Sequence, residues 1–305
     1  MVLMHFIESQ QLDKESIFDI FDKADKIREN KFVEPILNGK LLATLFYEPS
    51  TRTRLSFEAA MLKLGGGVIT TENAKEFSST IKGESLEDSI RVVSSYVDVI
   101  VLRHHDEGGA KIAASISKVP IINAGDGKGQ HPTQALIDVY TIYKEIGRLE
   151  NLKIAMVGDL ASGRTVRSLC YLLGKFPGNE IIFVSPEHLK MKNDIKEYLL
   201  KHNLKFTEEK NLDNILPEVD IVYMTRIQKE RITLDEYQNA IGKYMINLSN
   251  LALLKPSARI LHPLPKVEEI KIPVDVENSD ARIAYFRQAE NGLYIRMALL
   301  AYLIG

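Results

Sequence analysis

Residues 41–54 read LLATLFYEPSTRTR, and this stretch decides the fold of the chain. The short apolar run at 41–46 is typical of a buried strand, and Glu48-Pro49 ends it. Apolar residues then recur at helical spacing from Leu55 to Leu62, until three glycines at 65–67 end the pattern. The order strand, polar turn, helix is the unit from which α/β domains are built.

The same order recurs along the rest of the chain. Further strands are predicted at 97–102, 119–122, 154–157, 181–184, 220–224 and 258–261. Helices are predicted at 16–29, 108–117, 135–146, 165–174, 193–202, 235–244 and 293–304. Repeated strand and helix alternation predicts an α/β fold of parallel β-sheets flanked by helices on both faces.

Length and a restart of the pattern predict two domains. A chain of 305 residues is too long for one small core and suits two α/β domains of about 150 residues each. The strand, turn and helix theme begins again at Leu152. We predict a first domain of residues 1–132 plus 288–305 and a second of residues 133–287, with the last helix returning to the first domain.

Composition bounds the class of protein and its partners. An apolar fraction of 45% and a charged fraction of 26% are average for soluble globular proteins. The net charge of −2 favours neither nucleic acid nor an acidic membrane as partner, so an anion site must be built locally. The single cysteine, Cys170, excludes an intrachain disulfide and a cysteine-rich metal site. With no signal-like start and no apolar run near the ~20 residues of a membrane helix, we expect a reducing, cytoplasmic location.

The segment Ser50-Thr51-Arg52-Thr53-Arg54 is the densest chemical signal. It follows a predicted strand and opens a helix, where unpaired N–H groups and the positive end of the helix dipole attract anions. Three hydroxyls and two guanidinium groups add donors suited to a phosphate dianion. The alternative is a Ser/Thr helix cap followed by two surface arginines. The flanking residues decide in favour of a phosphate site.

Those flanks are Phe46-Tyr47-Glu48-Pro49 and Leu55-Ser56-Phe57-Glu58, and the whole stretch resembles the carbamoyl-phosphate signature of the aspartate and ornithine carbamoyltransferase family. The resemblance extends from about residue 40 to the C-terminus. Eight further blocks occur in the order of the family: 78–84, 102–104, 123–127, 131–134, 157–160, 163–165, 225–231 and 262–265.

The resemblance implies a site for carbamoyl phosphate. The phosphate would be bound by Ser50, Thr51, Arg52, Thr53 and Arg103. The carbonyl oxygen would be polarised by Thr53, Arg103 and His131. The amide would donate to Gln134 and to the backbone carbonyls of Leu264 and Pro265. The catalytic set is then Arg52, Thr53, Arg103 and His131, with His131 a neutral hydrogen-bond donor.

Aspartate rather than ornithine is the implied acceptor. Two carboxylates need fixed cations, and Arg164 and Arg226 offer planar forks that bind carboxylates bidentately. By resemblance, Gln228 completes this acceptor site. The ornithine branch is expected to have a Ser-Met-Gly loop and a His-Cys-Leu-Pro turn, whereas this chain has Arg226-Ile227-Gln228 and HPLP at 262–265. The reaction would belong to pyrimidine biosynthesis.

Further roles follow from the resemblance. Ser78 and Lys82 would reach the phosphate from a neighbouring subunit, which implies a homotrimer with shared active sites. Glu48 would pair with Arg164 and Arg231 when the domains close. No metal, cofactor or covalent intermediate is required, and the sequence does not tell whether regulatory chains bind.

Several alternatives stay open. An ornithine carbamoyltransferase and a non-enzymatic phosphate-metabolite-binding module are the competing functions. Residues 158–165 approach the P-loop pattern, but Arg164 stands where lysine is required. The run His104-His105-Asp106 could suggest a metal, yet a solvated loop is favoured. Lys266 replaces an expected arginine, which leaves the salt bridges near the 262–265 turn undecided.

Overall fold

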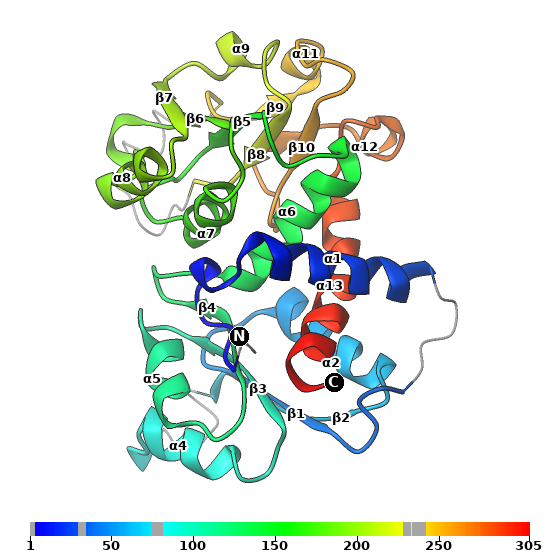
Figure 1. The fold of residues 1–305 in the computed structure, drawn as a ribbon. Coiled ribbons are helices and arrows are strands. Elements are labelled where there is room, and N and C mark those ends of the chain that lie inside the picture. The colour runs from blue at the N-terminus through cyan, green and yellow to red at the C-terminus, as the bar shows by residue number, and fades with distance from the viewer. Residues whose placement is uncertain (1–3, 30–34, 75–81, 228–232, 234–241) are drawn as a thin grey trace. The chain divides into compact units, whose positions relative to one another are not determined.

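The computed structural model describes residues 4–29, 35–74, 82–227, 233 and 242–305. The chain forms two compact units, Met1–Ile137 with Glu290–Gly305, and Asp138–Ala289. The limits between them fall inside the helices α6 (Pro132–Ile146) and α13 (Tyr285–Ile304). Each unit contains a parallel β-sheet with helices, which confirms the predicted fold class (Figure 1).

The first unit contains a four-stranded parallel sheet in the order β2-β1-β3-β4. Its strands are β1 (Leu41–Phe46), β2 (Gly67–Glu72), β3 (Val99–His104) and β4 (Ile121–Asp126). Its helices are α1 (Lys14–Glu29), α2 (Thr51–Lys63), α4 (Leu86–Val93) and α5 (Gly109–Ile116), with the short 3-10 turn η1 (Ser9–Gln11) before them. The strand β2 was not predicted, because it lies at the sheet edge and buries none of its side chains fully.

The second unit contains a five-stranded parallel sheet in the order β10-β8-β5-β6-β7. The strands are β5 (Lys153–Val157), β6 (Glu180–Val184), β7 (Lys205–Glu209), β8 (Ile221–Met224) and β10 (Arg259–Leu261). A separate pair consists of β9 (Ile246–Asn247) and β11 (Ile270–Lys271). The edge strand β7 was missed, since its sequence KFTEE is largely polar.

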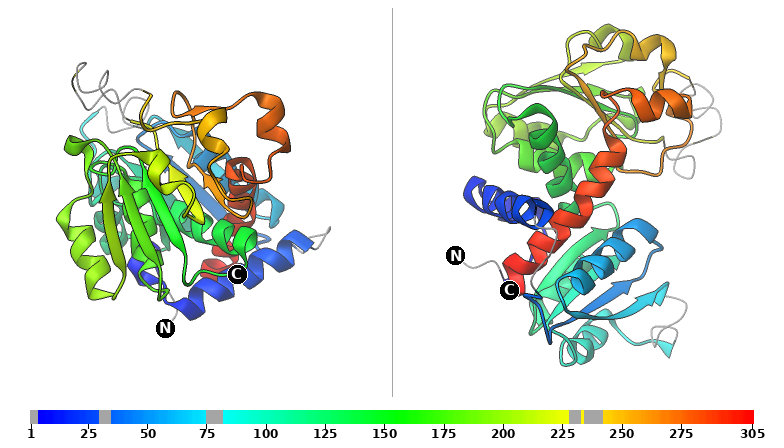
Figure 2. Two further views of the ribbon diagram at one scale, coloured as in Figure 1. Left: turned by 90° about the horizontal axis from the view of Figure 1, so that it is seen from above. Right: turned by 90° about the vertical axis from the view of Figure 1, so that its right-hand side faces the viewer.

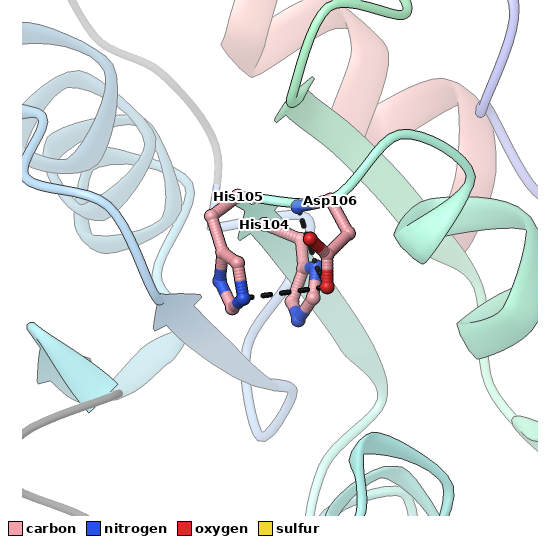
Figure 3. A group of neighbouring side chains, drawn as sticks. All are labelled: His104, His105 and Asp106. Carbon is pink, nitrogen blue, oxygen red and sulfur yellow. Dashed lines mark hydrogen bonds and ion pairs between the residues drawn. The ribbon is translucent and has the colours of Figure 1, made fainter.

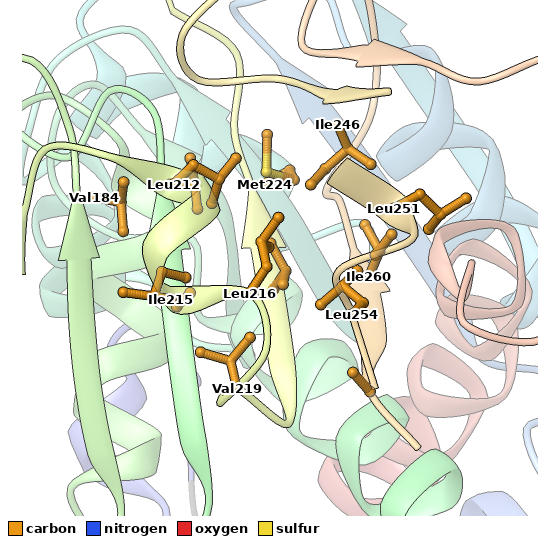
Figure 4. Close-up of a cluster of buried hydrophobic side chains, with 14 of the residues drawn as sticks. Val184, Leu212, Ile215, Leu216, Val219, Met224, Ile246, Leu251, Leu254 and Ile260 are labelled. Carbon is orange, nitrogen blue, oxygen red and sulfur yellow. The ribbon is translucent and has the colours of Figure 1, made fainter. Parts of the chain in front are cut away.

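Short and long helices surround the second sheet. They are α7 (Arg164–Leu173), η3 (Glu187–Leu189), α8 (Asn193–Lys201), α9 (Leu212–Ile215), α11 (Leu248–Leu251) and α12 (Val274–Ser279). Figure 4 shows part of the core, where Leu212 of α9, Met224 of β8 and Ile260 of β10 belong to one buried cluster. The central strands β5 and β8 bury every side chain but one, as strands covered on both faces must.

The C-terminal helix differs from its prediction. α13 begins at Tyr285 rather than at 293, and Figure 2 shows it in red as one continuous helix. The added turns contain Gln288 and Asn291, polar residues that are nevertheless buried. Apolar periodicity misses such turns because hydrogen bonds, not apolar packing, satisfy their side chains. The helix predicted at 235–244 lies mostly outside the described residues. Among the helices that are described, none has the length and apolar character needed to cross a membrane.

Candidate active site

The first turn of α2 presents a set of hydrogen-bond donors at the end of β1. Ser50 precedes the helix with φ −160° and ψ 87°, and within the described part of the chain its side chain makes no capping hydrogen bond. Ser50, Thr51 and Arg52 are partly or fully exposed, whereas Thr53 is buried. A helix start whose first N–H groups face outward beside free hydroxyls is suited to bind an anion.

The two arginines of this segment have different surroundings. Arg54 donates to Thr70 at 3.2 Å and forms ion pairs with Glu72 at 2.8 Å and Glu58 at 3.5 Å. Arg52 is exposed and makes no ion pair with any residue that the structure describes. The two guanidinium groups are therefore not equivalent, since Arg54 already has protein partners. Arg54 contacts the edge strand β2, and Arg52 stays the predicted cation for the ligand.

Arg103 lies beside this turn because of strand register. β1 and β3 are parallel neighbours, and Phe46 is paired with Arg103. The guanidinium group of Arg103 contacts Glu48 at 3.3 Å and donates to the carbonyl of Ala124 at 3.3 Å. Its side chain is 15% exposed. The carboxyl ends of parallel strands lie at the same end of a sheet, so Arg103 and the start of α2 lie at the same end of the first sheet.

His131 is placed at the start of α6 by a tight loop that follows β4. The carboxylate of Asp126 accepts hydrogen bonds from the backbone of Gln130 at 2.9 Å and of Gly108 at 3.1 Å, which closes the loop. Pro132 occupies the first helical position, three residues before the predicted helix start at 135. His131 is buried, and its Nδ1 lies 3.2 Å from the hydroxyl of Thr133. A Thr133 hydroxyl that donates to Nδ1 leaves the proton on Nε2, the tautomer that a neutral donor requires.

In the second unit, Arg164 and Arg226 follow neighbouring parallel strands. Val157 at the end of β5 is paired with Met224 at the end of β8. Arg164 begins α7, and Arg226 lies two residues beyond β8. The turns touch at Gly158, whose φ is +116° and whose Cβ, if present, would lie 2.2 Å from the carbonyl oxygen of Thr225. Only glycine fits there, so the close approach brings the two arginines to the same sheet edge.

The turn at 262–265 follows the next strand, β10, at that same edge. Leu264 has φ +52°, and the Leu264–Pro265 peptide bond is cis. Lys266 forms an ion pair with the buried carboxylate of Glu277 at 2.8 Å. This pair settles the salt bridge that the sequence left undecided: lysine takes the place of the expected arginine with a partner of its own. The turn and the two arginines thus follow three adjacent strands, β10, β8 and β5.

Some predicted residues are not placed. Ser78, Gln228 and Arg231 lie outside the described residues, and Lys82 is exposed. The ion pair of Glu48 with Arg103 lies within the first unit. Its predicted pairing with Arg164 and Arg231 stays a prediction.

The cluster His104, His105 and Asp106 brings its possible ligand atoms within 4.8 Å of one another (Figure 3). The geometry does not suit a metal ion. Nδ1 of His104 already accepts the backbone N–H of Asp106 at 3.1 Å, and the two imidazole rings are stacked 4.3 Å apart. Lone pairs of a histidine lie in the ring plane, so stacked rings do not aim both at one ion. The prediction of a solvated loop is only partly right, because His104 ends β3 and is buried, whereas Asp106 is exposed.

Asp138, Tyr223 and Gln288, which belong to no predicted motif, form a buried hydrogen-bonded chain in the second unit. These residues are separated by up to 150 positions, so no local pattern joins them. The available signal was one acid inside an apolar helical run, since Asp138 interrupts ALIDVY at 135–140. A buried acid of this kind requires partners.

Family comparisons cover nearly the whole chain. Residues 4–144 match the carbamoyl-phosphate-binding domain of the aspartate/ornithine carbamoyltransferases, and residues 150–303 match their aspartate/ornithine-binding domain. The chain belongs to the aspartate/ornithine carbamoyltransferase family.

Relatives with curated names are similar over almost the full length. The aspartate carbamoyltransferase catalytic subunit of Methanocaldococcus jannaschii is 50% identical over 306 residues, which cover 99% of this chain and 98% of that protein. A chloroplastic aspartate carbamoyltransferase of Pisum sativum is 55% identical over 98% of this chain and 78% of its own length.

Solved structures of similar proteins agree. The catalytic subunit of the M. jannaschii aspartate transcarbamoylase superposes with a TM-score of 0.90 at 49% identity, over 99% of this chain and 98% of that one. The aspartate transcarbamoylase of Trypanosoma cruzi, solved with carbamoyl phosphate and aspartate, has a TM-score of 0.92 at 35% identity, over 100% and 98% of the two chains.

Proposed function

We propose that this chain transfers the carbamoyl group of carbamoyl phosphate to L-aspartate, which yields N-carbamoyl-L-aspartate and phosphate. The observation that carries the proposal is that different groups lie at the carboxyl ends of the strands in the two sheets. One edge joins the α2 start, Arg103 and His131, which suit a phosphate and a polarised carbonyl. The other presents Arg164 and Arg226 on neighbouring strands, which suits two carboxylates. Relatives about 50% identical are named aspartate carbamoyltransferases.

The proposed chemistry needs positioning and charge stabilisation. The neutral amine of aspartate attacks the carbamoyl carbon, the carbonyl oxygen gains negative charge, and the bond to the phosphate oxygen breaks. Thr53, Arg103 and His131 donate to that oxygen, and each such donor typically lowers the barrier by ~2.7–4 kcal/mol. The departing phosphate takes the proton of the amine, so no side-chain base is required. Gln134 and the carbonyls of Leu264 and Pro265 orient the amide.

The direct test is an acceptor assay on the purified chain. Initial rates of carbamoyl transfer from carbamoyl phosphate are measured with aspartate and with ornithine at matched concentrations. We expect carbamoyl-aspartate as the product and no turnover of ornithine. Transfer to ornithine alone would favour the second family branch. Binding of phosphate without transfer to either amine would favour the non-enzymatic module.

We also propose a homotrimer in which Ser78 and Lys82 complete the site of a neighbouring subunit. An apolar surface on α2 supports a subunit contact: Leu55 and Leu62, two helical turns apart, are 50% and 60% exposed. Leu62→Glu is expected to shift the chain toward monomers in sedimentation velocity. Leu200→Glu is the matched control, because Leu200 on α8 is equally exposed. Equal behaviour of both variants would contradict a contact through α2.

Sharing of the site is tested by complementation. Arg52→Ala chains and Lys82→Ala chains are mixed, dissociated and reassociated. If one site takes Arg52 from one subunit and Lys82 from the next, some hybrid sites contain neither substitution and activity returns. Hybrid trimers without any recovered activity would contradict sharing. The names of archaeal and clostridial relatives describe catalytic subunits, which supports a search for regulatory chains by co-purification.

A cytoplasmic location and a role in pyrimidine biosynthesis complete the proposal. The one thiol, Cys170, is buried and reduced, which suits a reducing compartment. The names of plant relatives place them in chloroplasts. Cell fractionation distinguishes the two, since recovery in an organelle fraction would overturn the cytoplasmic assignment.

A further inference from the structure

The turn at 262–265 is held by the side chain of its own first residue. Nδ1 of His262 accepts the backbone N–H of Leu264 at 2.8 Å. On the other side of the ring, Nε2 lies 2.9 Å from a carboxylate oxygen of Glu269. His262 is 2% exposed and Glu269 is 6% exposed, so both contacts are shielded from water. The ring therefore bridges the turn to a buried acid.

These contacts define the tautomer of His262. Nδ1 accepts a hydrogen bond from an N–H group, so it carries no proton, and the proton must be on Nε2. Nε2–H then donates to Glu269, whose carboxylate also accepts the backbone N–H of Val267 at 2.9 Å. Burial alone would raise the pKa of Glu269, but these hydrogen bonds outweigh it and lower that pKa. The acid stays ionised and keeps the ring in one orientation.

The bond to Leu264 matters because the conformation of Leu264 is unfavourable. Its φ of +52° lies in the left-handed region, which residues other than glycine, asparagine and aspartate rarely adopt. A non-glycine residue persists there only when its surroundings hold it. The Nδ1 atom of His262 stabilises this conformation, since it accepts the hydrogen bond of the Leu264 N–H. Release of that bond would let the turn relax and move the Leu264 and Pro265 carbonyls.

The backbone of His262 is anchored as well. Its N–H donates to Gln288 at 2.8 Å, and the amide of Gln288 donates to Asp138 at 2.6 Å. The other carboxylate oxygen of Asp138 accepts the hydroxyl of Tyr223 at 2.7 Å. Asp138, Tyr223 and Gln288 are all at most 1% exposed. This buried chain ties the turn to β8, the strand that leads to Arg226.

We propose that His262 is a positioning residue for carbamoyl phosphate: through its Nδ1 acceptor it holds Leu264 in the conformation that aims the 264–265 carbonyls at the carbamoyl amide. The inference rests on the proposed function, because that function assigns the amide to these carbonyls. It predicts a specific consequence. Loss of the acceptor weakens recognition of the amide and leaves recognition of the phosphate at the α2 start unchanged.

Two nearly isosteric variants separate the two ends of the ring. In His262→Asn the side-chain oxygen can take the place of Nδ1 and accept from Leu264, while the contact with Glu269 is lost. In His262→Gln the longer amide can donate to Glu269, but no acceptor remains for Leu264. His262→Ala removes both. Glu145→Gln is the stability control, because Glu145 forms an ion-pair cluster with Arg259 and Arg287 in the same unit that does not touch the turn.

The probes are phosphonoacetamide, which has a phosphonate and an amide, and inorganic phosphate, which lacks the amide. Dissociation constants are measured by calorimetry on the full chain. We expect His262→Ala and His262→Gln to bind phosphonoacetamide about tenfold more weakly, equivalent to about 1.4 kcal/mol, and to bind phosphate within roughly twofold of the parent. His262→Asn should restore phosphonoacetamide binding to within about threefold. Glu145→Gln should lower the melting temperature and leave both constants unchanged.

The results that would contradict this role of His262 can be told apart. Phosphonoacetamide binding that survives in His262→Gln, or that fails to return in His262→Asn, would overturn the role of the Nδ1 acceptor. An equal loss for both probes would assign His262 to general stability. Failure of the proposed function has a different signature, since the parent protein would then transfer no carbamoyl group to aspartate in the acceptor assay, whatever the His262 variants bind.

Discussion

Arg103→Lys is the most informative single change to the proposed donor site. The guanidinium group of Arg103 acts in two directions at once, with one nitrogen 3.3 Å from Glu48 and another 3.3 Å from the carbonyl of Ala124. Lysine keeps the charge but has one nitrogen, so it cannot maintain both contacts and also point a donor at the carbonyl oxygen of the substrate.

The expected magnitude follows from the role of that donor. Loss of one donor to a developing oxyanion typically costs ~2.7–4 kcal/mol of transition-state stabilisation. At ~1.4 kcal/mol for each factor of ten, kcat should fall about 100- to 1000-fold. The KM for aspartate should change much less, because Arg103 belongs to the sheet edge that binds the donor substrate.

The assay is the initial rate of carbamoyl-aspartate formation at saturating carbamoyl phosphate, with a thermal melt to verify folding. Arg167→Lys is the matched control. Arg167 on α7 also uses two nitrogens at once, on the two carboxylate oxygens of Asp194, but it lies outside the proposed site. A kcat of Arg103→Lys within about threefold of the parent would refute the polarising role, since no donor of the expected strength would have been lost.

Three further outcomes are expected. Glu48→Ala should weaken the apparent affinity for aspartate and lower kcat, and steady-state kinetics equal to those of the parent would contradict a role for Glu48 in closure. Glu145→Gln should lower stability by about 2 kcal/mol at pH 7, or about 4–8 °C in a thermal melt, because Arg259 and Arg287 lose their shared carboxylate. Burial alone would raise the pKa of Glu145, yet the two arginines lower it. The ionised carboxylate therefore stabilises the folded protein fully above the unfolded pKa near ~4.3, and this stabilisation is lost as the pH falls through the lower folded pKa. A difference in melting temperature that persists undiminished in more acidic solution would contradict this. Burial raises the pKa of the Cys170 thiol, so a thiol reagent at pH 8 should label only unfolded chains, and rapid labelling of the native protein would count against a buried structural cysteine.

The fold class could be predicted from local patterns because they carry enough information about single elements. Buried parallel strands appear as apolar runs, and the helices between them repeat apolar residues every third or fourth position. The prediction failed at two of the four edge strands, β2 and β7, whereas the edge strands β4 and β10 overlap predicted strands. No side chain of β2 or β7 is fully buried, so their sequences lack the apolar run that marks a buried strand.

The proposed donor site could also be predicted from the sequence, since one short segment contains the helix start, the hydroxyls and Arg52. The different contacts of its two arginines could not be predicted. Arg52 and Arg54 look equivalent in the sequence, and only the pairing of β1 with β2 places Glu72 within reach of Arg54. The difference between the two arginines is a tertiary effect.

The sequence by itself determined that the chain is an α/β protein, and it predicted a phosphate-binding turn and two arginines for an acidic acceptor. Tertiary structure decided what holds those groups in place. Gly158 is required because Thr225, far away in sequence, passes its backbone, and His262 is oriented by Glu269, Gln288 and, beyond them, Asp138. Local patterns record the preference of each segment, whereas register and burial depend on which segments meet, and only the folded chain brings those partners together.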